Sequence, residues 1–185
     1  MRKIFLTVAV LATFSMALAQ SNCKFCGDWV GTILTDYPHN TKSNGNGDWR
    51  IGKVTYYIRI NKYGEKYTIK IKHHFAEGDI GTVYNNDYEY YEVLDVTDTS
   101  IYFKATDEMS CNHDQYDRIT GCSKLVLYFL VTYHSGYIHY QLTDVYALEY
   151  NKDIQYIGTT REDLSRWLKK FPEYNMDLYK EDNDW

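Results

Sequence analysis

The four cysteines of this sequence could bind a metal, act in redox chemistry or form disulfide bonds. They occur as two close pairs, Cys23 with Cys26 and Cys111 with Cys122. Reduced thiols could bind zinc beside His113, and C-x-x-C resembles a redox motif, but a redox motif needs its first cysteine near a helix N-terminus. Cys23 and Cys26 instead precede a strand-like segment. An even number of cysteines in an oxidising compartment favours disulfide bonds, so we expect all four to be structural.

The pairing of these cysteines has three possibilities, and the sequence does not choose among them. Cys111 and Cys122 flank the loop CNHDQYDRITGC. A bond between them would tie the ends of that loop together if the two residues lie opposite each other on a hairpin. We favour this pair, with Cys23 and Cys26 as a second bond.

Catalytic and metal-binding patterns are missing from the rest of the sequence. None of the six histidines belongs to an H-E-x-x-H array, and G-x-S-x-G, phosphate-loop and Rossmann glycine patterns are also absent. The carboxylates of the segment YEYYEVLDV alternate along one strand and are interpreted as solvated. We therefore predict a protein that is not an enzyme and that needs neither a cofactor nor a metal.

Asp144 is the most informative single residue. In the segment YIHYQLTDVYALEY, strict alternation places its carboxylate on an otherwise apolar face. A buried charge must be paired, hydrogen-bonded or neutralised. One explanation is a bulge, a tyrosine hydroxyl or a backbone amide that satisfies the carboxylate. The other is an anchor for a polar ligand group inside a cavity, and both remain open.

Tyrosine is abundant, with 20 residues in the chain. A tyrosine ring is apolar and carries a polar hydroxyl at its tip, which suits either a cavity wall or ordinary core packing. If a cavity exists, these rings favour a flat or amphipathic ligand. The tyrosines expected to line an interior together with Asp144 are Tyr56, Tyr67, Tyr88, Tyr90, Tyr102, Tyr128, Tyr140 and Tyr146.

The side chains named above lie in segments where apolar and polar residues alternate, which is the pattern of β-strands. KVTYYIRI and KYTIKIK alternate cleanly and predict an antiparallel hairpin around the turn NKYGE. YEYYEVLDV with SIYFKAT, and SKLVLYFLVTY with YIHYQLTDVYALEY, predict two more hairpins. Residues 125–131 are apolar on both faces, so another element should cover their outer side. The segment PHNTKSNGNGDWRIG is predicted to be a long loop.

A single helix is predicted near the C-terminus, at about residues 160–171. Thr159 or Thr160 can cap its start, acidic residues follow in the first turn, and lysines lie at its end. Its apolar side chains form one stripe suited to packing on a sheet. The acidic tail from residue 173 to residue 185 is expected to be loosely held.

The N-terminal sequence MRKIFLTVAVLATFSMALA has the features of a secretory signal peptide, with two basic residues, an apolar run and an A-L-A ending. We predict a signal peptide at 1–19, one domain at 20–185 and a secreted or periplasmic location. No later segment is long and apolar enough to predict a transmembrane span. Without the two basic residues of the signal the net charge is −7, which argues against a nucleic-acid partner.

The order of these features resembles the lipocalins and, more broadly, the calycins. Gly27-x-Trp29 stands near the start of the mature chain, followed by a long loop, an up-and-down series of strands and a late helix. Thr143-Asp144 resembles the second motif of that group, although Val145 rather than tyrosine follows. Arg161 and Arg166, on the predicted helix, are the only candidates for its late arginine. About seven strands are counted, and IQYIGTT is a candidate eighth.

The resemblance implies a mainly β fold, an antiparallel up-and-down meander barrel with Trp29 at its floor. Such barrels have room for side chains or for one small ligand. The sequence thus predicts a lipocalin-like protein that binds a small apolar or amphipathic molecule. The alternative is a β-sheet protein with a filled core that acts as a protein- or glycan-interaction module. A tyrosine-lined cavity of roughly 300 Å³ or more would favour the first, whereas an interior filled by side chains together with an exposed apolar patch would favour the second.

Overall fold

Strands make up most of this chain in its computed structural model, which describes residues 23–38, 49–77, 83–85 and 89–181. The predicted signal peptide, Tyr88 and most of the predicted long loop lie outside the described residues. No helix in the described part is both long and apolar enough to cross a membrane. The described strands are β1 (Gly27–Pro38), β2 (Trp49–Tyr63), β3 (Lys66–Glu77), β4 (Val83–Asn85), β5 (Glu89–Val96), β6 (Ser100–Thr106), β7 (Ser110–His113), β8 (Ile119–His134), β9 (Tyr137–Tyr150), β10 (Tyr156–Arg161) and β11 (Asn175–Lys180).

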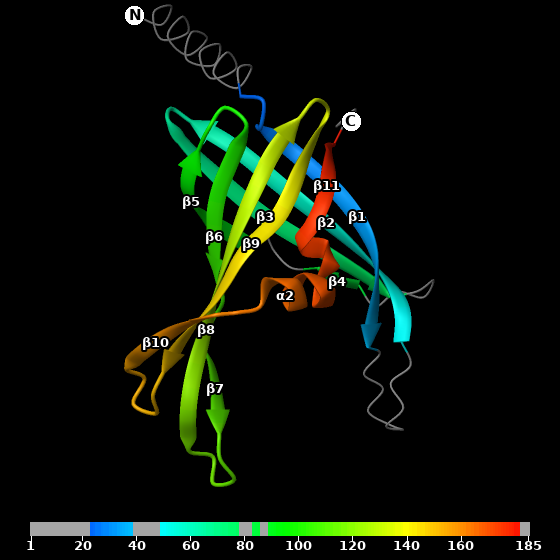
Figure 1. Cartoon of the computed structure of the whole chain (residues 1–185). Coiled ribbons are helices and arrows are strands. Elements are labelled where there is room, and N and C mark those ends of the chain that lie inside the picture. The colour runs from blue at the N-terminus through cyan, green and yellow to red at the C-terminus, as the bar shows by residue number, and fades with distance from the viewer. Residues whose placement is uncertain (1–22, 39–48, 78–82, 86–88, 182–185) are drawn as a thin grey trace, which may run out of the picture.

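Eight of these strands close into an antiparallel barrel. Their order is β9-β11-β1-β2-β3-β5-β6-β8, and β8 pairs with β9 to complete the circle (Figure 1). The predicted hairpins β2–β3, β5–β6 and β8–β9 are all present. The period-two pattern of these strands is compatible with closure, because a sheet with one apolar face can bury that face by curling around it. The mainly β barrel with one late helix is therefore confirmed.

The end of the chain differs from the prediction. Residues 175–180 are not a loose tail but strand β11, which inserts between β1 and β9. Met176 and Leu178 on this strand are buried in the core. Gly31 makes the close approach possible, because a Cβ at this position would come within 2.7 Å of the Asp177 carbonyl oxygen. The eighth barrel strand is thus β11, whereas IQYIGTT contributes β10 outside the barrel.

The late helix α2 (Leu164–Lys170) is shorter than predicted. It begins after Asp163, whose side chain accepts a hydrogen bond from the Arg166 backbone amide. Thr159 and Thr160 do not cap it, because both belong to β10. A short 3₁₀ helix, η1 (Pro172–Tyr174), connects α2 to β11.

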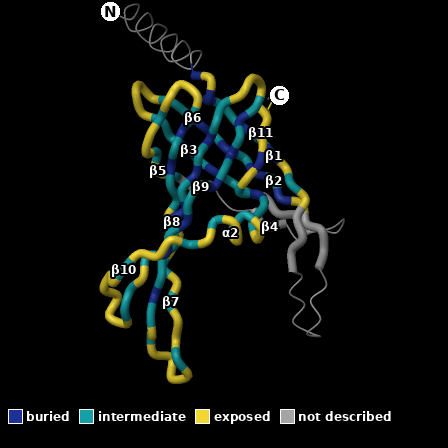
Figure 2. The backbone as a smooth tube through the Cα atoms, in the orientation of Figure 1, coloured by how far each residue is buried: buried dark blue, intermediate teal, exposed yellow. Residues whose placement is uncertain are grey.

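An arm projects from the end of the barrel that lies near α2 (Figure 1). Strands β8 and β9 are longer than the barrel, and their outer halves pair with β7 and β10 to make a four-stranded sheet. We call this sheet, residues 110–126 and 144–161, the arm. The disulfide bond between Cys111 and Cys122 joins β7 to β8 within it, as the loop spacing predicted. Figure 2 shows that most of the arm is exposed or intermediate, whereas buried residues concentrate in the barrel.

Candidate functional site

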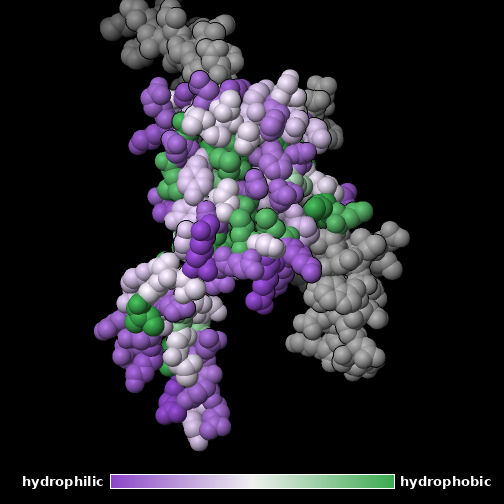
Figure 3. Space-filling view, viewed as in Figure 1, coloured by the Kyte–Doolittle hydropathy of each residue, from purple (hydrophilic) through white to green (hydrophobic). Residues whose placement is uncertain are grey.

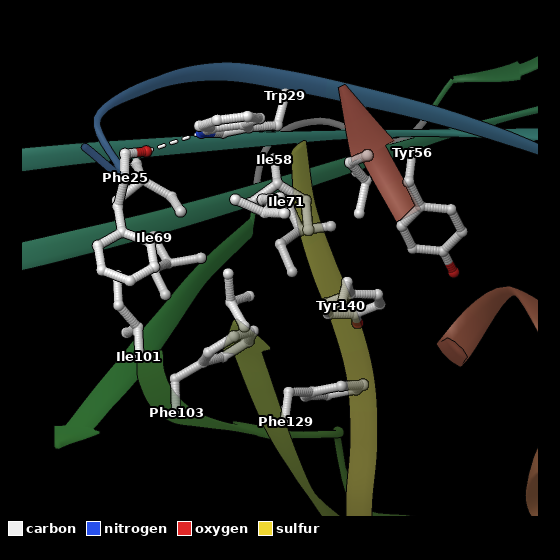
Figure 4. Close-up of a cluster of buried hydrophobic side chains, with 14 of the residues drawn as sticks. Phe25, Trp29, Tyr56, Ile58, Ile69, Ile71, Ile101, Phe103, Phe129 and Tyr140 are labelled. Carbon is white, nitrogen blue, oxygen red and sulfur yellow. Dashed lines mark hydrogen bonds between the residues drawn. The ribbon is translucent and has the colours of Figure 1, made fainter. Parts of the chain in front are cut away.

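The interior of the barrel is filled by its own side chains over most of its length. Aliphatic residues from all sides meet there, and each strand contributes alternate positions (Figure 4). Residues of this filled region that are no more than 3% exposed include Ile58, Ile60, Ile69, Ile71, Ile101, Phe103, Val131, Ile138, Leu142 and Leu178. The described side chains pack against one another through this part of the barrel, so its two ends are the candidates for a ligand site.

The end of the barrel nearest the N-terminus is closed. The Cys23–Cys26 disulfide makes a tight turn, and Phe25 within that turn is buried. The indole Nε1 of Trp29 donates a hydrogen bond of 2.7 Å to the Phe25 carbonyl oxygen (Figure 4). Gly27 has a φ of +128°, a conformation that glycine adopts readily, and it turns the chain from this plug into β1. Gly27, Trp29, Cys23 and Cys26 therefore all serve the structure of this end.

The opposite end of the barrel holds a cavity of about 190 Å³, which we call the cup. The floor of the cup is the surface of the filled core that faces this end of the barrel. The hydroxyl of Tyr56 points away from the isoleucines of that core (Figure 4). The residues that line the cup come from β2, β3, β5, β6, β8, β9 and η1 and from the residue after β6. They are Tyr56, His73, Tyr91, Ala105, Thr106, Asp107, Leu127, Phe129, Tyr140 and Tyr174.

Aromatic rings dominate the wall of the cup. The Tyr140 ring stacks on Phe129, with centroids 5.0 Å apart, and lies 6.0 Å from the Tyr56 ring. The imidazole of His73 in turn stacks on the Tyr56 ring, with ring centroids 5.7 Å apart. Tyr174 meets Phe129 edge-on at 5.6 Å. Packed rings of this kind hold one another in place, so the wall is pre-formed rather than assembled by a ligand.

The chain segment after the arm covers the side of the cup. Leu164, Trp167 and Leu168 of α2 are partly buried against the core, and Tyr174 of η1 joins them. The predicted apolar stripe therefore packs on the barrel, although on its end rather than on the outer face of residues 125–131. Of this segment, Tyr174 lines the cup itself.

Two carboxylates lie in or next to the cup. Asp107 lines it, and the neighbouring Glu173 is only 5% exposed. Burial raises the pKa of the Tyr140 phenol well above its ordinary value, and nearby Tyr56, Tyr91, Tyr174 and Glu173 raise it further. The phenol of Tyr140 therefore keeps its proton well into the alkaline range.

Tyr140 predicts how the stability depends on alkaline pH. An unfolded tyrosine ionises near pH 10, whereas folded Tyr140 keeps its proton, so the unfolded state loses a proton first. Stability should be unaffected by this group below about pH 10 and should fall above it, by up to about 1.4 kcal/mol per pH unit. Urea unfolding of Tyr140→Phe between neutral pH and about pH 11 should show a shallower decline. Tyr179→Phe, at an exposed position, is the control. Equal declines in wild type and Tyr140→Phe would contradict the expectation.

Four of the predicted interior residues lie on the outside. Tyr102 and Tyr128 alternate with the buried Phe103 and Phe129, so they face away from the core. A β-bulge at Thr143 shifts the register of β9, and Asp144 consequently pairs with Tyr128 on the outer face. Its carboxylate accepts a hydrogen bond from Arg161, which lies on β10 rather than on a helix. The interior placement predicted for Tyr102, Tyr128, Asp144 and Tyr146 is therefore wrong, and the bulge explanation of Asp144 is confirmed.

The other predicted tyrosines that the structure describes lie at different places. Tyr56 and Tyr140 line the cup. Tyr67 packs against the core at the start of β3, and Lys62 lies over its ring. Tyr90 is a residue of β5, paired with Lys70. His73, Tyr91, Asp107 and Tyr174 line the cup without having been predicted.

The signals for the missed residues were weak. His73 shares a face with Ile69 and Ile71, a period of two that the sequence already displays. Asp107 follows the last residue of β6, where turn carboxylates are common, and Tyr174 reaches the cup only because β11 returns to the barrel. No group of three or more His, Cys, Asp or Glu side chains in the described part of the chain has the arrangement of a metal site.

Comparison with known proteins yields no match: no family, no curated protein and no solved structure is significantly similar to this chain. The closed eight-stranded barrel is therefore established from the coordinates alone. Membership of the lipocalin or calycin group stays a prediction.

Proposed function

We propose that this chain is a secreted, non-catalytic, lipocalin-like protein that binds one small amphipathic molecule in the cup. The observation that carries the proposal is a space of about 190 Å³ that lies at one end of the filled core and is bordered on one side by Tyr174 of η1. Aromatic rings and polar groups line this space together, which suits a small molecule that has both an apolar and a polar part. Barrels of about eight strands commonly hold one small ligand at such an end.

The volume of the cup limits the size of the ligand. It is below the roughly 300 Å³ expected above for a ligand-carrying barrel, so that criterion is not met, and the cup is too small for a drug-sized molecule. An engineered apolar cavity of about 150 Å³ is known to hold benzene. A molecule with one aromatic ring and a short polar substituent therefore matches the 190 Å³ of the cup.

Several features support the wider description. Two disulfide bonds fit a chain that folds in an oxidising compartment. The predicted signal peptide agrees with export. The Gly27-x-Trp29 motif lies at the closed end of the barrel, as the resemblance to lipocalins implies.

A binding experiment with 2-phenylethanol tests the proposal. Isothermal titration calorimetry should detect saturable binding of one molecule per chain. Ala105→Leu places extra side-chain volume in the cup and should abolish the binding. Gly158→Leu is the matched control, because a Cβ at this position on β10 meets no atom within 4 Å. Equal binding by wild type and Ala105→Leu, or no binding of this probe, of its amine analogue or of its carboxylate analogue, would contradict the proposal.

The arm supports the alternative, a protein that acts through its surface. Ile154, Tyr156 and Ile157 are each more than half exposed on or beside β10. Figure 3 shows hydrophobic surface on the outer edge of the arm amid hydrophilic neighbours. Ile154 has a φ of +61°, a conformation that is costly for a β-branched residue. The turn around it is held by the Asn151 side-chain oxygen, which accepts hydrogen bonds from the backbone amides of Asp153 and Gln155. This alternative becomes the leading one if the cup binds none of the probes.

A further inference from the structure

We propose that the arm mediates self-association, in which β10 of one copy pairs antiparallel with β10 of a second copy around a twofold axis at Thr159. This inference does not depend on ligand binding in the cup. Three observations support it: the free edge of β10 among the described strands, an exposed apolar cluster that contains a strained isoleucine, and a strand sequence that is compatible with pairing to itself.

Strand β10 lies at the edge of the arm, where it pairs with β9 alone among the described strands. The backbone amide of Glu162, directly after β10, donates a hydrogen bond of 2.8 Å to the Val145 carbonyl oxygen of β9. Backbone groups alternate in direction along a paired strand, so the amides and carbonyls of Thr159 and Arg161 point away from β9. Outward backbone groups of this kind are a template for pairing with another strand.

An exposed apolar cluster lies at the start of this edge. Ile154, Tyr156 and Ile157 are 51%, 58% and 61% exposed (Figure 3). Contiguous apolar surface on a folded protein commonly marks an interaction site. Ile154 also has a φ of +61°, which suits glycine or asparagine better than a β-branched residue. The fold thus holds an isoleucine in a strained conformation while exposing its side chain, which points to a role for that side chain outside the monomer.

Strand β10 lacks the residues that usually prevent edge strands from pairing. Residues 154–161 contain neither proline nor lysine, and Arg161 is the only charged residue among them. The Arg161 guanidinium donates a hydrogen bond to the Asp144 carboxylate of its own chain. The irregular part of β10 lies at its start, between Tyr156 and Gly158, and the pairing with β9 is regular from Gly158 to Arg161. The regular part is therefore straight enough to accept a further strand.

The occupant that this edge fits is a second copy of β10. With Thr159 on the axis, the outward groups of Thr159 meet those of the same residue in the second copy, and Arg161 lies opposite Ile157. Thr–Thr pairs directly opposite each other favour antiparallel pairing, whereas like charges opposite each other oppose it. Here two arginines do not face each other. Because β10 lies along the projecting arm, antiparallel pairing places the two barrels at opposite ends of the joined arms (Figure 1).

Sedimentation velocity of the chain from residue 20, without the predicted signal peptide, tests the proposal. Pairing through one short strand buries less surface than a standard interface, so we expect a weak dimer with a Kd of about 10–100 µM. Thr159→Lys places a charge at the centre of the pairing and should raise the Kd at least about tenfold. Asn112→Lys adds the same charge to an exposed residue of β7, at the opposite edge of the arm, and should leave the Kd unchanged.

Ile154→Asn tests the role of the strained residue. Asparagine adopts a positive φ more readily than isoleucine, so the urea midpoint of the dilute, monomeric chain should rise. The same substitution removes an exposed apolar side chain from the cluster, so the Kd of the dimer should also rise. A role confined to the stability of the monomer would change only the first of these two measurements.

The outcomes decide between this dimer and other uses of the edge. A wild-type chain that stays monomeric up to about 1 mM would overturn the proposal and leave β10 to a different partner. Equal Kd values for wild type and Thr159→Lys would also overturn it, as would an Ile154→Asn chain that associates as tightly as wild type. Thermal unfolding verifies that each variant is folded. Failure of 2-phenylethanol to bind the cup would leave this inference standing.

Discussion

Ending the chain after Tyr174 is expected to abolish the folded barrel. This truncation removes β11, which pairs with both β1 and β9 and closes the circle of strands. It leaves two long edges unpaired and removes the buried side chains of Met176 and Leu178. Unpaired edges of this kind promote aggregation. Near-ultraviolet circular dichroism should show loss of fixed aromatic packing, and the truncated chain should aggregate at neutral pH.

Single substitutions on β11 give a graded form of the same test. Leu178→Ala should lower the free energy of unfolding by about 2–5 kcal/mol, because Leu178 is completely buried. Tyr179→Ala, one residue further on the same strand and 57% exposed, should cost less than about 1 kcal/mol. Urea unfolding at equilibrium measures both values. A truncated chain that remains folded, or equal effects of the two substitutions, would show that β11 does not close the barrel in solution.

Trp29→Ala is expected to have the largest effect of any single substitution at the closed end. Removing a buried tryptophan costs about 3–5 kcal/mol. The loss of its Nε1 donor also leaves the buried Phe25 carbonyl without that hydrogen bond, which costs about 1–3 kcal/mol more. A small domain has only about 5–15 kcal/mol of stability in total. We therefore expect the Trp29→Ala protein to be largely or partly unfolded at room temperature.

Two further variants separate the contributions at Trp29. Trp29→Phe keeps much of the ring but lacks the donor, so its loss should lie between wild type and Trp29→Ala. Trp167→Ala, on the partly buried face of α2, is the control and should cost clearly less. Chemical unfolding followed by far-ultraviolet circular dichroism applies to all three. If Trp167→Ala proves as destabilising as Trp29→Ala, the plug of Phe25 and Trp29 is not the main anchor of this end.

Local sequence patterns were sufficient for the three main hairpins and for one disulfide. Period two in residues 53–60 and 66–72 needs only neighbouring positions, because alternate side chains on a strand face opposite sides. The Cys111–Cys122 bond also depends on a local hairpin, which the loop between the two residues indicates. These features survive in the structure because their causes lie within a few residues of each other.

The candidate site could be predicted only in part. Tyr56 and Tyr140 were expected in an interior and do line the cup, because their strands alternate without interruption up to that point. Beyond Thr143 the expected alternation of β9 fails, since one bulged residue moves every later side chain to the other face. A bulge depends on the partner strand, so the pattern of β9 alone does not reveal it.

The amino-acid sequence by itself determined that apolar and polar residues alternate along long strands and that the chain folds into an antiparallel β structure. Only the tertiary structure decided which strand closes the barrel, where β8 and β9 leave it to form the arm, and which rings border a space. The physical reason is that closure and cavities are set by contacts between residues far apart in the chain. Met176 and Leu178 read as part of an acidic tail until β1 and β9 bury them.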